Sequence, residues 1–216
     1  MGKDIMSLAS DLSCLFSEAK PEPIQEGSVQ VKETINKHAM RRVLSELALE
    51  KELAWHFEQG VSYHCVSWGD VDALTYLRVV VKQQKLKYAL ISSWCIASED
   101  IAEVRSWIER GYVKRCDFFV GEIFRASYCK QLQELIDLCK TLGGRVAIAR
   151  IHAKVMVMLG ERFDCVVESS ANVNTNPRIE NTVVTVDTEL AYWYKNFFDG
   201  IRSFERNFDD VKAWQE

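Results

Sequence analysis

The sequence lacks the features that would place it in a membrane or outside the cell. The chain of 216 residues contains only three prolines and no run of about 18 apolar residues, the length that a membrane span needs. Its first residues, MGKDIMSLAS, have no basic region followed by an apolar block, so they do not resemble a secretory signal. From these absences we predict a cytoplasmic protein that does not bind a membrane.

Cysteine is present, but it lacks the spacing that metal and redox sites use. None of the seven cysteines forms a C-x-x-C pair, and their odd number argues against complete disulfide pairing. Most of them lie in apolar stretches, where a thiol behaves as a small hydrophobic side chain. We therefore expect reduced structural cysteines, no metal site and no cofactor.

An excess of positive charge is also missing. The chain has 27 Lys and Arg against 31 Asp and Glu, which gives a formal net charge of −4. A protein that coats nucleic acid through charge alone would be basic overall, so the net charge argues against this class. Net charge does not exclude a compact phosphate-binding site.

Two regions differ in their sequence patterns. Residues 1–60 begin with a mixed segment that contains KPEPIQEGS, which we interpret as a linker. Apolar residues then recur every fourth position over 31–59, which predicts a helix that ends at Gly60. We expect 1–60 to be a linker and helical arm, with a helix that packs on the main domain or on a protein partner, and 61–216 to be the main domain.

The first part of the main domain alternates between strand and helix patterns. Apolar runs predict strands and helical periodicity predicts helices, in the order 61–67 strand, 70–84 helix, 87–93 strand, 98–111 helix, 116–122 strand, 127–144 helix and 145–150 strand. In the 98–111 helix, Ser98 is the expected N-cap and Gly111 the expected stop. This order predicts an α/β fold with a mostly parallel sheet covered by helices on both faces.

After Arg150 the helical patterns give way to closely spaced strands. Strands are predicted at 151–158, 163–170 and 181–187, followed by an aromatic-rich final helix at 188–208. We expect the aromatic side chains of this helix to pack in the core or against a second copy of the chain.

The predicted strand IHAKVMVM contains a histidine and a lysine that strand alternation places on the same face. His152 and Lys154 share that face with Met156 and Met158. A partly buried lysine needs a partner or an anion, because an unpaired charge away from water is costly. A lysine beside an imidazole therefore indicates a site for a negatively charged group.

The two following segments add polar groups to the same end of the sheet. The next strand ends in ESSAN, which contributes Ser170 and Asn172 as hydrogen-bond donors, and RIEN contributes Glu180, a carboxylate able to orient an imidazole. A cation and donors suit the charge of a pentacoordinate phosphate, and an imidazole nitrogen can attack phosphorus. The combination suits attack on a phosphodiester.

These residues resemble the phospholipase D superfamily, whose pattern is H-x-K-x(4)-D followed by G-S-x-N. The motif covers residues 152–180, and about 150 residues are similar when the preceding βαβ units are included. The resemblance implies a metal-independent phosphodiesterase that works through a covalent phosphohistidine. It further implies that His152 is the nucleophile or acid, that Lys154 binds phosphate, that Ser170 and Asn172 supply donors, and that Glu180 orients an imidazole.

The chain departs from the family pattern at two positions. Leu159 stands where the motif aspartate is expected, Asp164 lies five residues later, and Ser169 replaces the motif glycine. The motif also occurs once, because the other histidines have no lysine two residues on; they are His38, His56 and His64. A mechanism with two histidines then requires a second chain, so we expect a homodimer with the active site across its two-fold axis.

We predict a nuclease that acts on DNA or RNA, because the chain is small, carries a single motif and has no predicted membrane-binding stripe. Two alternatives remain: a catalytically degenerate module that binds nucleic acid or a protein partner, and a phospholipid hydrolase. Near the expected strand ends, Trp68 and Trp94 could stack bases or simply pack, and Arg125 or Arg150 could hold flanking phosphates.

Overall fold

The computed structural model describes residues 47–51, 53, 57–67, 71–174, 178–204 and 211–212. The predicted linker and most of the 31–59 helix lie outside these residues. Residues 47–51 are helical, but Phe57 and Glu58 have no regular secondary structure and Gln59 and Gly60 form a turn, so the predicted helix does not reach Gln59. Leu49 and Leu53 are buried in the main core. The proposed division at residue 60 stays a prediction.

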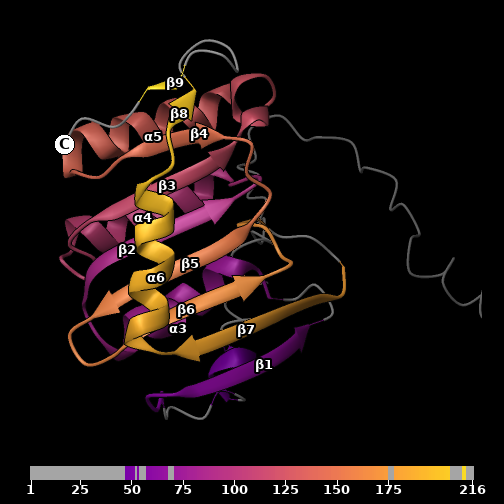
Figure 1. The fold of residues 1–216 in the computed structure, drawn as a ribbon, viewed down its shortest axis with the longest axis vertical. Coiled ribbons are helices and arrows are strands. Elements are labelled where there is room, and N and C mark those ends of the chain that lie inside the picture. The colour runs from indigo at the N-terminus through magenta and orange to yellow at the C-terminus, as the bar shows by residue number, and fades with distance from the viewer. Residues whose placement is uncertain are drawn as a thin grey trace, which may run out of the picture. The chain divides into compact units, whose positions relative to one another are not determined.

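A seven-stranded sheet forms the centre of the domain, in the strand order β1-β7-β6-β5-β2-β3-β4 (Figure 1). The strands are β1 (Val61–Ser67), β2 (Leu86–Ser93), β3 (Cys116–Gly121), β4 (Val146–Ala149), β5 (Lys154–Gly160), β6 (Asp164–Ser169) and β7 (Glu180–Val186). Two short strands, β8 (Ser203–Phe204) and β9 (Val211–Lys212), pair separately. Each of the seven predicted strands is present, with ends shifted by at most a few residues.

The prediction of a mostly parallel sheet was wrong. Only β2 with β3 and β3 with β4 pair in parallel. The pairs β1·β7, β7·β6, β6·β5 and β5·β2 are antiparallel. β5, β6 and β7 are consecutive strands joined without crossover helices, so they pair antiparallel, and they lie between β1 and β2 in the sheet.

Helices cover both faces, which confirms the α/β class. The helices α3 (Ala73–Gln83), α4 (Ser98–Glu109) and α5 (Cys129–Leu142) pack on one face in the larger apolar cluster, and α6 (Thr188–Asp199) packs on the other (Figure 1). A short 3-10 helix, η2 (Glu122–Arg125), follows β3. Along β5, Met156 and Met158 contact the larger cluster, whereas Val155 and Val157 belong to the smaller one, as strand alternation predicts.

Side chains cap the N-terminal ends of two helices, α3 and α6. Asp72 and Asp187 cap α3 and α6 by accepting hydrogen bonds from the backbone N–H three residues later, at 2.9 Å and 2.7 Å. Two predictions of helix ends were wrong. Ala97, not Ser98, is the N-cap of α4, and no side chain bonds there. The final helix stops at Asp199 instead of 208, with Gly200 next.

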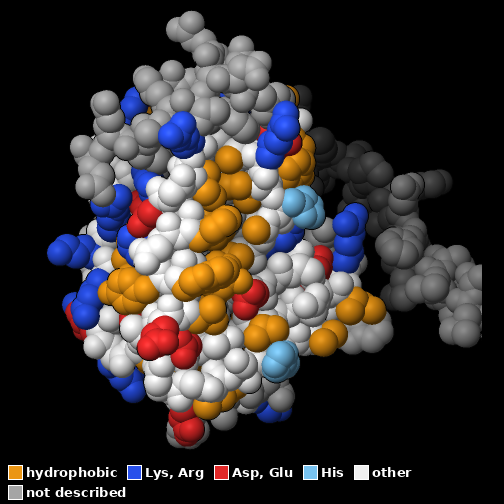
Figure 2. Space-filling model, viewed as in Figure 1, with side chains coloured by type: hydrophobic (Ala, Val, Ile, Leu, Met, Phe, Trp, Pro, Cys, Tyr) orange, Lys and Arg blue, Asp and Glu red, His pale blue; other side chains and the backbone are white. Residues whose placement is uncertain are grey.

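Part of the aromatic set on α6 faces outward. Phe198 is buried, but Trp193 and Phe197 are 60% and 63% exposed, and Figure 2 shows apolar side chains gathered over this helix. These two rings therefore do not pack in the core of the described chain. No helix among the described residues combines the length and apolar character that crossing a membrane requires.

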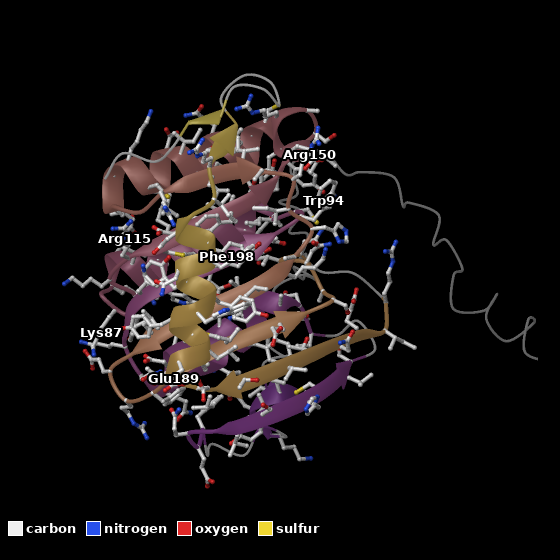
Figure 3. The ribbon with its side chains drawn as sticks, in the orientation of Figure 1. Lys87, Trp94, Arg115, Arg150, Glu189 and Phe198 are labelled. Atoms are coloured by element: carbon white, nitrogen blue, oxygen red, sulfur yellow. The ribbon has the colours of Figure 1, made fainter. Side chains whose placement is uncertain are left out.

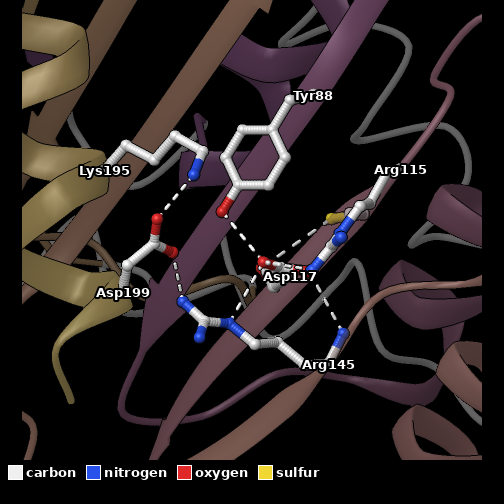
Figure 4. A network of polar contacts seen from close by, with 7 residues as sticks. Tyr88, Arg115, Asp117, Arg145, Lys195 and Asp199 are labelled. Carbon is white, nitrogen blue, oxygen red and sulfur yellow. Dashed lines mark hydrogen bonds and ion pairs between the residues drawn. The ribbon is translucent and has the colours of Figure 1, made fainter. Parts of the chain in front are cut away.

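A buried polar network fixes α6 to the sheet. Asp117 on β3 is 1% exposed and accepts hydrogen bonds from Tyr88 Oη at 3.0 Å, Arg115 Nε at 3.1 Å and Arg145 Nε at 3.1 Å (Figure 4). Arg145 also pairs with Asp199 at the end of α6. Burial, followed by the charge of Asp117, raises the pKa of Tyr88 well above its ordinary value, so this phenol stays a hydrogen-bond donor.

Candidate active site

The predicted site residues lie at one end of the sheet, where neighbouring strands begin or end. Lys154 is the first residue of β5, Ser170 follows the last residue of β6, and Glu180 is the first residue of β7. These three strands are adjacent, and Lys154 is paired with Ser169 across the β5–β6 ladder. The three residues therefore lie at the same end of the sheet. His152 lies just before β5, in the connection from β4.

His152 and Lys154 are in direct contact. The Lys154 ammonium lies 3.2 Å from His152 Nδ1, 3.3 Å from Nε2 and 2.7 Å from the His152 carbonyl oxygen. A neutral imidazole has one acceptor nitrogen, so the ammonium can donate to only one ring nitrogen at a time. The imidazole is exposed, whereas Lys154 is partly buried. An anion approaching from solvent can therefore reach the ring.

Burial lowers the pKa of Lys154, and the neighbouring Cys95 and Glu180 partly oppose this shift. The ammonium has lost part of its hydration without gaining a carboxylate ion pair among the described residues. A bound phosphate would restore a favourable charge interaction to this side chain. The position therefore favours an anionic ligand.

Ser170 and Glu180 form a connected pair. Ser170 Oγ donates to Glu180 Oε2 and accepts the backbone N–H of Asn181 at 3.0 Å. The Ser170 N–H in turn donates to the Asn181 carbonyl at 3.0 Å. Glu180 is thus hydrogen-bonded to Ser170, and its expected role of orienting an imidazole stays a prediction.

Asn172 is joined to the end of β2 instead of to β5. Its Oδ1 lies 3.4 Å from Ser93 Oγ, which donates more closely to the Cys95 carbonyl, at 2.8 Å. Ser93 Oγ also accepts the N–H of Val173 at 3.1 Å. These bonds connect the segment after β6 to the carboxyl end of β2.

Three residues of the site were missed or left undecided by sequence reasoning. Trp94 follows β2, and its ring centroid is 5.5 Å from that of His152, with a tilt of 54°. Gly121 lies under the indole, because a Cβ there would be 2.6 Å from Trp94 Cε3. Ser92 Oγ donates to the Ala153 carbonyl at 3.0 Å and so holds the His152 segment to β2. The SSWC stretch at a strand end was the available signal.

The position of the missing motif aspartate is far from this site. Leu159 lies five residues beyond Lys154, about 16 Å along an extended strand, and it is buried in the cluster on the α6 side. Asp164 accepts the Gly160 N–H at 3.0 Å in the hairpin after β5. Neither position contributes a side chain to the site.

The remaining candidates fall in different places. Trp68 lies outside the described residues, and Arg125 ends η2. Figure 3 places Arg150 near Trp94 at one end of the sheet and Lys87 toward the other. A cavity of about 440 Å³ lined by Lys85, Lys87 and Lys114 lies at that opposite end, so it is separate from the candidate site. The described residues contain no group of three or more His, Cys, Asp or Glu side chains arranged for a metal ion.

Comparison with known proteins finds similarity in structure only. The sequence matches no family model and no curated protein. Polyphosphate kinase from Porphyromonas gingivalis is similar over 64% of this chain and 25% of the kinase, with a TM-score of 0.50 and 17% identity. Phosphatidylserine synthase from Haemophilus influenzae Rd KW20 is similar over 70% of this chain and 41% of the synthase, with a TM-score of 0.50 and 10% identity.

A third structure, NucT from Helicobacter pylori, has a TM-score of 0.49 at 16% identity, over 71% of this chain and 100% of NucT. The chain spans less than half the length of the kinase and the synthase. The structures of the kinase and the synthase establish the fold. It is the phospholipase D-like α/β fold, here with a histidine and a lysine in contact at one sheet edge.

Proposed function

We propose that this protein is a metal-independent phosphodiesterase that cleaves nucleic acid through a phosphohistidine at His152. The contact between the exposed imidazole and the Lys154 ammonium, 3.2 Å from Nδ1, is the observation that carries the proposal. A nucleophilic nitrogen and a cation at this distance can engage the same phosphate. The fold alone does not select this activity, because one fold hosts many functions.

In the proposed reaction, a neutral imidazole nitrogen of His152 forms a bond to phosphorus while the bond from phosphorus to the leaving oxygen breaks. The leaving oxygen takes a proton from a second imidazole. Water then attacks phosphorus and gives a proton to that second imidazole, and the P–N bond breaks to regenerate His152. Both steps balance without an external oxidant or reductant.

The second imidazole is proposed to be His152 of the partner subunit in a homodimer. Among the described residues, the other histidine is His64, which is exposed on β1 in a strand paired at the edge of the sheet with β7. A two-fold axis next to the site would bring two copies of the same histidine together without further sequence. Glu180 would then be available to an imidazole from the partner once the single hydroxyl proton of Ser170, which Glu180 Oε2 accepts in the free protein, turns to the phosphate.

Lys154, Ser170 and Asn172 are proposed to bind the non-bridging oxygens of the phosphate. Lys154 supplies the charge, and its lowered pKa reflects burial that a phosphate would compensate. Ser170 and Asn172 lie next to β6 and supply hydroxyl and amide groups. Donors placed in this way act on the charge that develops in the transition state.

The test is cleavage in excess EDTA of single-stranded DNA, double-stranded DNA and RNA, with phosphatidylglycerol vesicles as a separate substrate. We expect cleavage of at least one nucleic acid, reduced by about 10³-fold or more in His152→Ala, and unchanged in the control His64→Ala. Cleavage that the chelator abolishes would contradict the mechanism. Hydrolysis of the vesicles alone would identify a lipid substrate, and salt-sensitive binding without cleavage would identify a binding module.

Subunit mixing tests the proposed dimer. Wild-type and His152→Ala chains are unfolded together in equal amounts and refolded, so that mixed dimers form. If every site needs both histidines, only wild-type dimers are active. Activity then falls to about one quarter of that of wild-type protein at the same total concentration. A fall to only one half would mean that each chain acts alone.

A further inference from the structure

The indole of Trp94 is the largest flat surface beside His152. Trp94 directly follows β2, and its ring centroid lies 5.5 Å from that of the imidazole. It is partly exposed, so part of its surface faces solvent.

One side of this indole is fixed by the backbone of β3. Gly121 has φ −68° and ψ 159°, a conformation open to any residue, so its backbone does not require glycine. The space does, because a Cβ would lie 2.6 Å from Trp94 Cε3, 2.9 Å from Cζ3 and 3.1 Å from the Ile151 carbonyl oxygen. The benzo half of the ring therefore packs directly on the chain at the end of β3.

Trp94 is thus rigidly backed on one side and adjacent to the histidine that would bind phosphorus. We propose, resting on the function proposed above, that Trp94 stacks a nucleobase next to the scissile phosphate, so that the site takes single-stranded nucleic acid. The ring centroids of Trp94 and His152 are 5.5 Å apart, so the base of a nucleotide whose phosphate is held at His152 would lie next to the indole. Stacking on aromatic side chains tolerates any base sequence.

The preference for a single strand follows from the same contact. In a duplex, both faces of each base are already stacked on neighbouring bases, so stacking on Trp94 would require the base to leave the helix. A single strand offers an accessible base without that cost. Arg150, which Figure 3 labels toward the same end of the sheet as Trp94, is the candidate contact for the flanking backbone.

The experiment measures binding separately from cleavage. Fluorescence anisotropy in EDTA measures the Kd of two labelled probes. One is a single-stranded oligodeoxynucleotide, and the other is a matched oligonucleotide in which every base is replaced by an abasic analogue. His152→Ala serves as the parent so that neither probe is cleaved. We compare Trp94→Ala and Trp94→Phe, with Trp193→Ala as the matched control, since Trp193 is an exposed tryptophan on α6.

We expect Trp94→Ala to raise the Kd of the base-containing strand about tenfold and the Kd of the abasic strand less than about twofold. Trp94→Phe should retain most of the binding, and Trp193→Ala should change neither Kd. A merely structural tryptophan would affect both probes alike, so equal losses would overturn the inference. Duplex of the same sequence bound as tightly as the single strand, or no oligonucleotide binding, would also overturn it.

The outcome for stacking is distinguishable from that for the proposed reaction. EDTA-resistant cleavage that requires His152, together with equal losses of affinity for the two probes in Trp94→Ala, would support the proposed phosphodiesterase and refute the stacking role. Base-dependent binding through Trp94 without cleavage by the wild type would support the stacking role and refute the proposed reaction.

Discussion

Replacing Gly121 by alanine tests the packing between β3 and Trp94. The new Cβ would lie 2.6 Å and 2.9 Å from two indole carbons, distances that side-chain carbons do not tolerate, so the ring or the backbone must move. The backbone conformation at Gly121 suits alanine, so steric overlap accounts for the whole cost. Overpacking of this kind costs about 1–3 kcal/mol.

The size of the chain converts this cost into a melting temperature. For domains of 150–250 residues, each kcal/mol corresponds to about 2–4 °C, so we expect Gly121→Ala to lower the Tm by about 2–12 °C. Because the displaced indole lies beside His152, the variant should also lose activity or nucleic-acid binding. Circular dichroism during heating and urea denaturation measure the stability loss.

A double-mutant cycle identifies the group that causes the loss. In a Trp94→Ala background the two close indole contacts are gone, and the contact with the Ile151 carbonyl at 3.1 Å remains. In this background Gly121→Ala should lower the free energy of unfolding by less than about 1 kcal/mol. The difference between its cost in the wild type and its cost here is the coupling energy, which we expect to be about 0.5–3 kcal/mol. The same cost in both backgrounds, or no cost in the wild type, would refute the packing of Trp94 on Gly121.

Three further predictions concern other parts of the molecule. Asp117→Ala leaves the Tyr88 hydroxyl without its acceptor and Arg145 with Asp199 as its remaining carboxylate, so it should lower the free energy of unfolding by about 1–3 kcal/mol in urea denaturation; a loss below about 0.5 kcal/mol would contradict this. Because burial lowers the pKa of Lys154, kcat/KM should fall as pH rises through a value below the ordinary 10.5, and Lys154→Arg should abolish that limb in a pH profile, since arginine stays charged. Leu159→Asp buries a carboxylate opposite Asp164, so it should destabilise the protein by about 3 kcal/mol or more without raising activity; a gain in activity would show that the position communicates with the site.

The seven strands of the main sheet were predictable because each has a local pattern. The strand at 61–67 and the strand ending at Ser93 match the structure, and β5 alternates between the two apolar clusters as its sequence indicates. Strand direction was not predictable from the same pattern. The insertion of β5, β6 and β7 between β1 and β2 depends on long-range pairing, which apolar periodicity does not encode.

The candidate site was predictable where its residues share a strand or adjacent strand ends. His152 and Lys154 are two positions apart on one chain segment, and Ser170 and Glu180 lie at the two sides of one connection. Gly121 could not be assigned, because its role depends on the tertiary contact with Trp94. Which rings of α6 face the core could not be assigned either, since aromatic content does not reveal which side of a helix meets the sheet; packing of the exposed rings against a second copy stays a prediction.

Detection of a covalent intermediate on His152 tests the central proposal most directly. The protein is mixed with a scissile oligonucleotide in EDTA, quenched in alkali within the first turnover, and digested for mass spectrometry. We predict a nucleotidyl adduct on the peptide IHAK, residues 151–154, that is lost in acid and absent from His152→Ala. Product formation in EDTA with His152 unmodified at every time point, or product formation by His152→Ala, would contradict the account.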